Sequence, residues 1–157
     1  MSFKDSLAKG KTGESLFLSL FPKLKQLSGR KSDFCNPRTG LLIELKSDFY
    51  NMEHTENFFI ELYSDIDRKK VGGPRQAAEH GTDLWAYLYM ENSAVFFFKV
   101  SALVRWLDQN ESKYKPLRIM NKGWITSGIL VKRDDLKHLY KKITFKQKSL
   151  AKKAKVD

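Results

Sequence analysis

Residues 41–47, with the sequence LLIELKS, constrain the fold most strongly, because they read as a β-strand that carries charge on one face only. Successive side chains of a strand point to opposite faces of the sheet. The apolar side chains at positions 41, 43 and 45 are therefore expected to pack into the core. Glu44 and Lys46 then lie side by side on the other face, where they form either a functional site or a structural ion pair.

A second strand is predicted at residues 28–35, and residues 36–40 between the two strands have the composition of a hairpin turn. Asp33 is therefore expected to approach Glu44 across the hairpin. Two neighbouring carboxylates repel each other and favour a cation between them. Mg²⁺ is the expected ion, because it prefers oxygen ligands and often takes only one or two carboxylates.

Lys46 adds a positive charge beside this carboxylate pair. An ammonium group can orient a water molecule for attack and can stabilise charge that develops on a phosphate. Together with Asp33 and Glu44 it supplies the groups that metal-assisted phosphodiester hydrolysis needs. The competing interpretation is a cross-strand charge pair on a solvated face of the sheet.

Two further acidic residues, Glu14 and Glu61, are candidates for the same site. Glu14 lies in a helix predicted over residues 12–21, three residues before Phe17 and therefore on its core-facing row. A metal contact, direct or through water, would explain it. Glu61 lies in a strand predicted over residues 57–63, on the face opposite the apolar side chains. It is either a fourth functional acid or an ordinary exposed residue.

The chain order Glu14, Asp33, Glu44-x-Lys46 resembles the PD-(D/E)XK nuclease superfamily, most closely its Holliday junction resolvases and small phage-type endonucleases. The resemblance covers roughly residues 10–100. It implies an α/β fold with a restriction-endonuclease-like αβββαβ core, in which helices flank a mixed central sheet. It also implies Mg²⁺-dependent cleavage of DNA, with Mn²⁺ able to substitute. Asp33, Glu44 and Glu14 would then be metal ligands, and Lys46 would serve the attacking water.

The sequence departs from the superfamily at two places. Ser32 stands where a Pro often precedes the Asp, a position that the superfamily often relaxes. The recombination-type exonucleases carry Gln-x-x-x-Tyr on the next helix, but here Gln76 is followed by His80. This argues against an exonuclease and leaves Gln76 as a candidate phosphate contact.

The charge of the chain favours a polyanionic partner. Its 157 residues include 29 Lys and Arg against 18 Asp and Glu, a formal net charge of +11. DNA, branched or duplex, is the simplest partner. Much of the excess lies near the C-terminus, so we expect one nuclease domain at residues 1–145 and a basic, mobile tail at residues 146–157.

Basic side chains near the predicted site are candidates for contacts with the DNA backbone. Glycine and a helix start follow the basic run at residues 68–70, which suits an approach to phosphate. The candidates are Lys11, Arg30, Lys31, Arg38, Arg68, Lys69, Lys70 and Arg75.

Several classes of protein are not expected. Cys35 is the only cysteine, so neither an intramolecular disulfide nor a cysteine-based zinc site can form. The sequence has no long apolar run, no signal-peptide pattern and no phosphate-binding Gly-x-x-x-x-Gly-Lys motif. We therefore expect an intracellular, cytoplasmic protein of a bacterium or phage-infected host cell. We expect it to bind neither a membrane nor a nucleotide cofactor.

The rest of the chain reads as alternating strands and helices. The predicted order is completed by a helix from Gly72 to His80, strands at 83–90 and 94–100, a helix at 101–110, a strand at 124–131 and a closing helix from Asp134.

The residues favour a structure-selective endonuclease that resolves a Holliday junction or another DNA branch. Symmetric cutting of two strands would require a homodimer, because one such domain has one site. A nicking or duplex endonuclease of phage or restriction type, without junction preference, is one alternative. A non-catalytic basic DNA-binding protein on a nuclease-like fold is the other.

Overall fold

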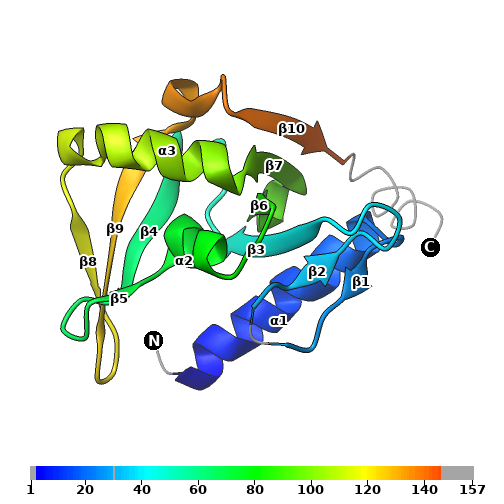
Figure 1. Ribbon diagram of the computed structural model, residues 1–157, viewed down its shortest axis with the longest axis horizontal. Helices are drawn as coiled ribbons and strands as arrows, with labels where there is room; N and C mark the ends of the chain where they lie inside the picture. The colour runs from blue at the N-terminus through cyan, green and yellow to red at the C-terminus, as the bar shows by residue number, and fades with distance from the viewer. Residues whose placement is uncertain (1–2, 30, 146–157) are drawn as a thin grey trace.

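The computed structural model describes residues 3–29 and 31–145, with the backbone alone for residues 3–7. The chain is a mixed α/β structure with a mixed central sheet and flanking helices, as the sequence indicates (Figure 1). In chain order the elements are α1 (Phe3–Leu20), β1 (Lys25–Gln26), β2 (Phe34–Cys35), β3 (Leu42–Asp48), β4 (Asn57–Asp65), β5 (Lys70–Val71), α2 (Gly73–Glu79), β6 (Leu84–Tyr89), η1 (Met90–Asn92), β7 (Ala94–Lys99), α3 (Val100–Asn110), η2 (Glu111–Lys113), β8 (Leu117–Met120), β9 (Ile125–Lys132), η3 (Arg133–Leu136) and β10 (Tyr140–Thr144), where η marks a 3₁₀-helix.

The central sheet has the strand order β1-β2-β3-β6-β7-β10. Among its described strands only β3 and β6 are parallel neighbours, and the other pairs are antiparallel. A parallel pair needs a crossover connection, because a hairpin joins antiparallel strands. The chain makes this crossover through β4, β5 and α2 before it returns as β6.

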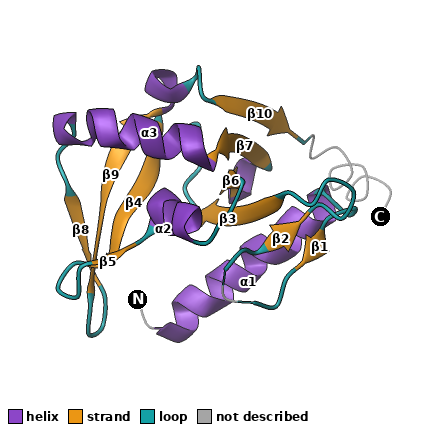
Figure 2. Cartoon of the chain, viewed as in Figure 1, coloured by secondary structure: helices purple, strands orange, loops and turns teal. Residues whose placement is uncertain are grey.

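A second, antiparallel sheet has the order β5-β4-β9-β8 (Figure 2). The strands predicted at residues 57–63 and 124–131 are β4 and β9 of this sheet. The sequence analysis does not predict β5 or β8, which are short strands at the two sides of the sheet. The structure therefore has two sheets, where the sequence analysis expected one central sheet.

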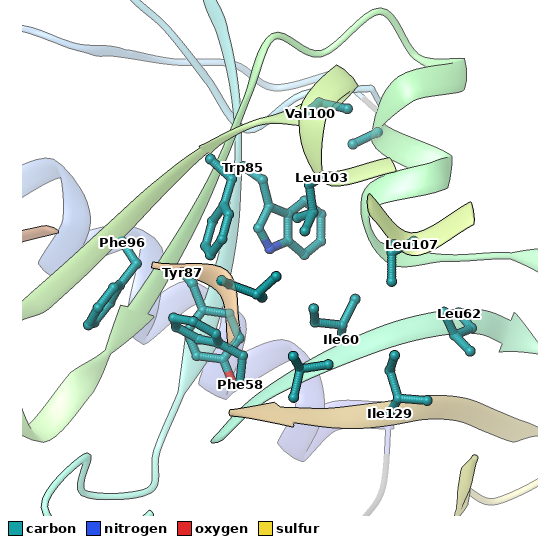
Figure 3. Packing of buried hydrophobic residues seen from close by; sticks show 14 of the residues in the cluster. Phe58, Ile60, Leu62, Trp85, Tyr87, Phe96, Val100, Leu103, Leu107 and Ile129 are labelled. Carbon is teal, nitrogen blue, oxygen red and sulfur yellow. The ribbon is translucent and has the colours of Figure 1, made fainter. Parts of the chain in front are cut away.

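The central sheet buries side chains on both faces. On one face, α1 packs its fully buried Phe17 against Ile43 of β3 and its neighbours. On the other face, α3 and the second sheet enclose an aromatic core, in which Phe58 of β4 packs edge-on against Tyr87 of β6 and to which α3 contributes Leu103 (Figure 3). The odd-numbered residues of β3 thus face α1, and its even-numbered residues face the second sheet.

Two predicted boundaries near the N-terminus are wrong. The first helix begins at Phe3 instead of residue 12, and the Thr12 hydroxyl donates to the Ala8 carbonyl at 2.9 Å inside the helix. The strand predicted over residues 28–35 is reduced to the two residues of β2. The N–H of Leu27 donates to the carbonyl of Asp33 at 2.8 Å, and the described residues between them, 28–29 and 31–32, lie outside any strand.

The closing helix predicted from Asp134 is also wrong. The 3₁₀-helix η3 ends at Leu136, and the chain then extends as β10 along the edge of β7. Tyr140 packs edge-on against Phe96, with 4.8 Å between the ring centroids. Pairing with an open strand edge and aromatic packing outweigh the local helix signal here. Among the described residues, no helix is long and apolar enough to cross a membrane.

Candidate active site

Asp33 and Glu44 face each other across the β2–β3 hairpin. Phe34 pairs with Ile43, so the antiparallel register puts Asp33, the residue before β2, opposite Glu44. The N–H of Asp33 donates to the Ile43 carbonyl at 3.0 Å, and the N–H of Leu45 donates to Asp33 Oδ2 at 2.8 Å. The second bond fixes the Asp33 carboxylate where β3 extends beyond its pairing with β2.

Helix α1 brings Glu14 to the same place, and Gly13 permits the approach. A Cβ atom on Gly13 would lie 1.8 Å from Ser47 Oγ, so a larger residue would push α1 away from β3. Gln26 Nε2 of β1 donates to Glu14 Oε2 at 2.9 Å. Partial burial raises the pKa of the Glu14 carboxyl, and the negative charge of Asp33 raises it further.

Burial and like charge change the protonation of this acid group. Desolvation, with smaller contributions from Asp33 and Glu14, raises the pKa of Glu44 to about 8. Burial also raises the pKa of Asp33, opposed by hydrogen bonds from the Leu45 N–H and from Glu44. The raised pKa of Glu44 favours a proton shared between the two carboxyl groups when no cation is present. A cation between the two groups would displace that proton.

The carboxylates present suit one hard cation that keeps several water ligands, rather than an ion enclosed entirely by protein side chains. No group of three or more His, Cys, Asp or Glu side chains is placed to hold a metal ion within the described ranges. Mg²⁺, however, commonly uses one or two carboxylates and keeps several waters. The Asp33–Glu44 pair matches that requirement, and the mutual repulsion of its carboxylates is what a divalent ion would relieve. Glu14 adds negative charge beside the pair.

Lys46 lies two residues beyond Glu44 on the same face of β3, as predicted. Its Nζ lies 5.8 Å from the centre of the Phe59 ring. Glu44 and Lys46 each line two cavities, a small one of about 210 Å³ towards α2 and a groove of about 1060 Å³ towards α1 and β8. The two side chains therefore lie between the small cavity and the groove.

Glu61 lies in the small cavity, next to Lys46. Burial raises the pKa of the Glu61 carboxyl, while the charge of Lys46 and a hydrogen bond from the Gly73 N–H oppose the rise. A Cβ atom on Gly72 would lie 1.8 Å from Glu61 Oε1, so glycine is needed there for the carboxylate to approach the start of α2. Glu61 is therefore half-buried and not an exposed strand residue, and its functional role stays a prediction.

Gln76 and Lys31 also line the small cavity, together with His80. The His80 Nδ1 lies 3.2 Å from the carbonyl of Lys31 and is hydrogen-bonded to it, which ties α2 to the loop that precedes β2. The cavity thus collects polar groups from β3, β4, α2 and that loop around Lys46.

The other basic candidates lie in different environments. Lys11 on α1 is exposed and lowers the pKa of Glu14, and Arg38 is exposed in the hairpin turn. Arg75 instead donates to Asp108 at 2.8 Å and to Glu111 at 2.9 Å, so its guanidinium joins α2 to the α3 region. Arg68 and Lys69 are exposed in the β4–β5 turn, and Lys70 is exposed at the start of β5. Arg30 and the tail at residues 146–157 lie outside the described residues.

Sequence reasoning missed Asp48 and Tyr87 as parts of this face. Asp48 continues the even-numbered row of Glu44 and Lys46 at the end of β3 and accepts a short hydrogen bond from the Tyr87 hydroxyl. The Tyr87 oxygen in turn accepts from the Phe59 N–H at 3.0 Å. The period of two along β3 is the sequence signal that points to Asp48.

No protein-family model matches the chain, and no curated protein matches its sequence. The case for a function therefore depends on the geometry described above.

Proposed function

We propose that this chain is a Mg²⁺-dependent endonuclease that hydrolyses phosphodiester bonds of DNA. The observation that carries the proposal is the Asp33–Glu44 carboxylate pair with Lys46 beside it on the same strand face. The raised pKa of Glu44 supports it, because such shifts gather at functional sites more than at solvated strand surfaces. Its position at the wall of a large groove gives a polymer access.

The arrangement of elements supports a restriction-endonuclease-like core. The elements α1, β1, β2, β3, α2 and β6 follow one another in the order of an αβββαβ unit, with β4 and β5 inserted before α2. Strands β1, β2, β3 and β6 are consecutive neighbours in the central sheet. The Glu, Asp and Glu-x-Lys residues that suggest a PD-(D/E)XK nuclease all lie on this unit.

Each residue of the site has a distinct role in the proposed reaction. Asp33 and Glu44 would hold the Mg²⁺ ion, and Glu14 would strengthen its binding by adding negative charge. When bound, the ion supplies Lewis-acid activation of water and neutralises charge on the phosphate. Lys46 Nζ donates hydrogen bonds that orient the attacking water and stabilise the developing negative charge. Glu61 lines the small cavity with Lys46, and its carboxylate would attract that ammonium group.

The charge of the chain favours DNA as the polymer. Its net charge of +11 attracts a polyanion, the exposed Lys11 lies on α1 with Glu14, and the exposed Arg38 lies in the turn between β2 and β3. We propose a branched substrate, such as a four-way junction, with a homodimer supplying one site for each of two strands. A nicking or duplex endonuclease remains the alternative within the same chemistry.

Cleavage assays test the proposal directly. Labelled four-way junction, fork, duplex and single-stranded DNA are incubated with the full chain, with and without Mg²⁺ or Mn²⁺. We expect metal-dependent cutting that Glu44→Gln abolishes and that Glu79→Gln, an exposed acid on α2, leaves unchanged. Paired cuts on the junction alone indicate a resolvase, and equal cutting of all duplexes indicates a general endonuclease. Tight binding without any cutting would leave a non-catalytic DNA-binding protein.

A further inference from the structure

The groove beside the acid group is lined on one side by exposed apolar side chains. Of the nine large apolar residues exposed among the described part of the chain, five line this groove: Phe49, Tyr50, Leu117, Ile119 and Leu130. Scattered exposed apolar residues are ordinary, whereas a group of them around one opening marks a binding surface. Lys9, Lys46 and Arg118 line the same groove.

The two exposed aromatic residues of the groove, Phe49 and Tyr50, lie on the loop between β3 and β4 (Figure 2). Tyr50 is 76% exposed, yet its N–H donates to Asp48 Oδ1 at 2.8 Å. Further along the loop, the N–H of Met52 donates to Asn92 Oδ1 at 2.9 Å. The backbone is therefore held at both sides of the exposed ring. A rigid support of this kind lowers the entropy lost when a ligand stacks on the ring.

The outer surface of duplex DNA does not complement such a wall. A duplex presents phosphates and sugars, which favour Lys, Arg and backbone N–H groups. Unpaired bases present flat apolar faces, and aromatic side chains next to cations bind them. Here Lys9 Nζ lies 5.4 Å from the centre of the Phe49 ring, so a cation and an aromatic face occur together.

We propose that this groove binds unpaired bases of DNA, with Tyr50 and Phe49 as the stacking platform beside the cleavage site. The inference rests on the proposed function and specifies its substrate as DNA whose bases are unpaired at a branch, bulge or fork. Lys9 and Arg118 contact the backbone of the same unpaired segment.

A second copy of the chain is a less suitable occupant of the groove. Glu14, Asp33, Glu44 and Lys46 line the same groove as the apolar residues. A protein partner that covered the apolar wall would also cover these groups and keep DNA from them. A DNA strand that follows the wall places its backbone beside them. The cations at the groove match the charge of DNA and oppose a second copy of this basic chain.

Binding measured without metal tests the inference separately from cleavage. The full chain is titrated in EDTA with a duplex and with the same duplex carrying a bulge of three unpaired thymines. We expect the bulged DNA to bind at least about fivefold more tightly, from the stacking of one base. Tyr50→Ala should remove this preference and Tyr50→Phe should keep it. Tyr63→Ala is the matched control, because Tyr63 is 39% exposed on β4 outside the groove.

Photocrosslinking identifies the contact. A 5-iodouracil placed in the bulge should crosslink to the peptide that contains Phe49 and Tyr50, and the same base within the paired duplex should not. Equal binding of both DNAs, or equal loss in Tyr50→Ala and Tyr63→Ala, would overturn the inference and leave the proposed function standing. A Tyr50→Ala variant that changes from dimer to monomer would show a self-interface instead. Failure to bind either DNA would contradict the proposed function itself.

Discussion

Gly13 of α1 lies against Ser47 of β3 so closely that a Cβ atom on the glycine would fall 1.8 Å from the serine hydroxyl oxygen. This contact sets the distance between the helix and the strand. Because Glu14 follows Gly13 directly, it also sets where the Glu14 carboxylate lies relative to Asp33 and Glu44.

Replacement of Gly13 with alanine should therefore disturb both stability and the acid group. We expect Gly13→Ala to lose about 1–3 kcal/mol of unfolding free energy, as for overpacking elsewhere, and to weaken Mg²⁺ binding. Gly10→Ala is the control on the same helix, because nothing lies within 4 Å of its added Cβ. It should gain about 0.5–1 kcal/mol. Urea unfolding measures both, and Ser47→Gly should partly rescue Gly13→Ala. Equal stability of the two alanine variants would contradict the close contact.

The stability of the metal-free protein should fall as the pH rises. The folded pKa of Glu44 is about 8, well above its ordinary value of 4.5, so the folded state retains a proton that the unfolded state loses between these values. Thermal unfolding in EDTA between about pH 5 and about pH 9 should show the decline, and Glu44→Gln should reduce its slope. Mg²⁺ should raise the unfolding temperature more at pH 8 than at pH 6, since it binds the deprotonated pair. If the unfolding temperature of Glu44→Gln fell with pH as steeply as that of the wild type, another group would be the cause of the decline.

Lys46 is expected to act on the reaction without holding the metal. Lys46→Met should reduce the cleavage rate by about 100-fold or more, while the stabilisation by Mg²⁺ stays close to that of the wild type. Single-turnover cleavage and thermal unfolding measure the two effects. Lys99→Met, at the exposed end of β7, provides the control. Loss of both activity and folding in Lys46→Met would instead support a structural ion pair.

Arg75 should contribute to stability more than to DNA binding. Its guanidinium bonds both Asp108 and Glu111, so Arg75→Ala should lower the unfolding free energy by about 1 kcal/mol. The salt dependence of DNA binding should stay the same. Arg38→Ala, in the exposed hairpin turn, should show the reverse pattern: unchanged stability and a smaller salt slope. A reduced salt slope in Arg75→Ala would restore its assignment as a phosphate contact.

The C-terminal residues 146–157 carry five lysines, and their removal tests the charge argument. We expect the shortened chain to bind DNA more weakly, with a salt slope reduced by up to about 4. Cleavage at low salt should persist, because the acid group lies within the described domain. Fluorescence anisotropy over a range of NaCl concentrations measures the slope. An unchanged slope would show that these lysines do not contact the backbone.

The local pattern of the sequence was sufficient to predict the centre of the site. The alternation in β3 put Glu44 and Lys46 on one face, and the hairpin turn put Asp33 opposite Glu44. Both depend on backbone geometry within about fifteen residues, where the period of a strand and the chemistry of a turn decide the outcome. The core-facing position of Glu14 likewise followed from the helical period.

Only the tertiary structure decided which residues far away in the sequence lie beside Asp33, Glu44 and Lys46. Strand β4 lies in a second sheet, which brings Glu61 beside Lys46, and the Gly72–Gly73 backbone makes room for its carboxylate. Arg75 has the same charge as the other basic candidates, but α3 and η2 supply its partners. Strand β10 forms because β7 offers an open edge, against the local signal for a helix. These outcomes depend on contacts between segments far apart in the chain, which no local periodicity encodes.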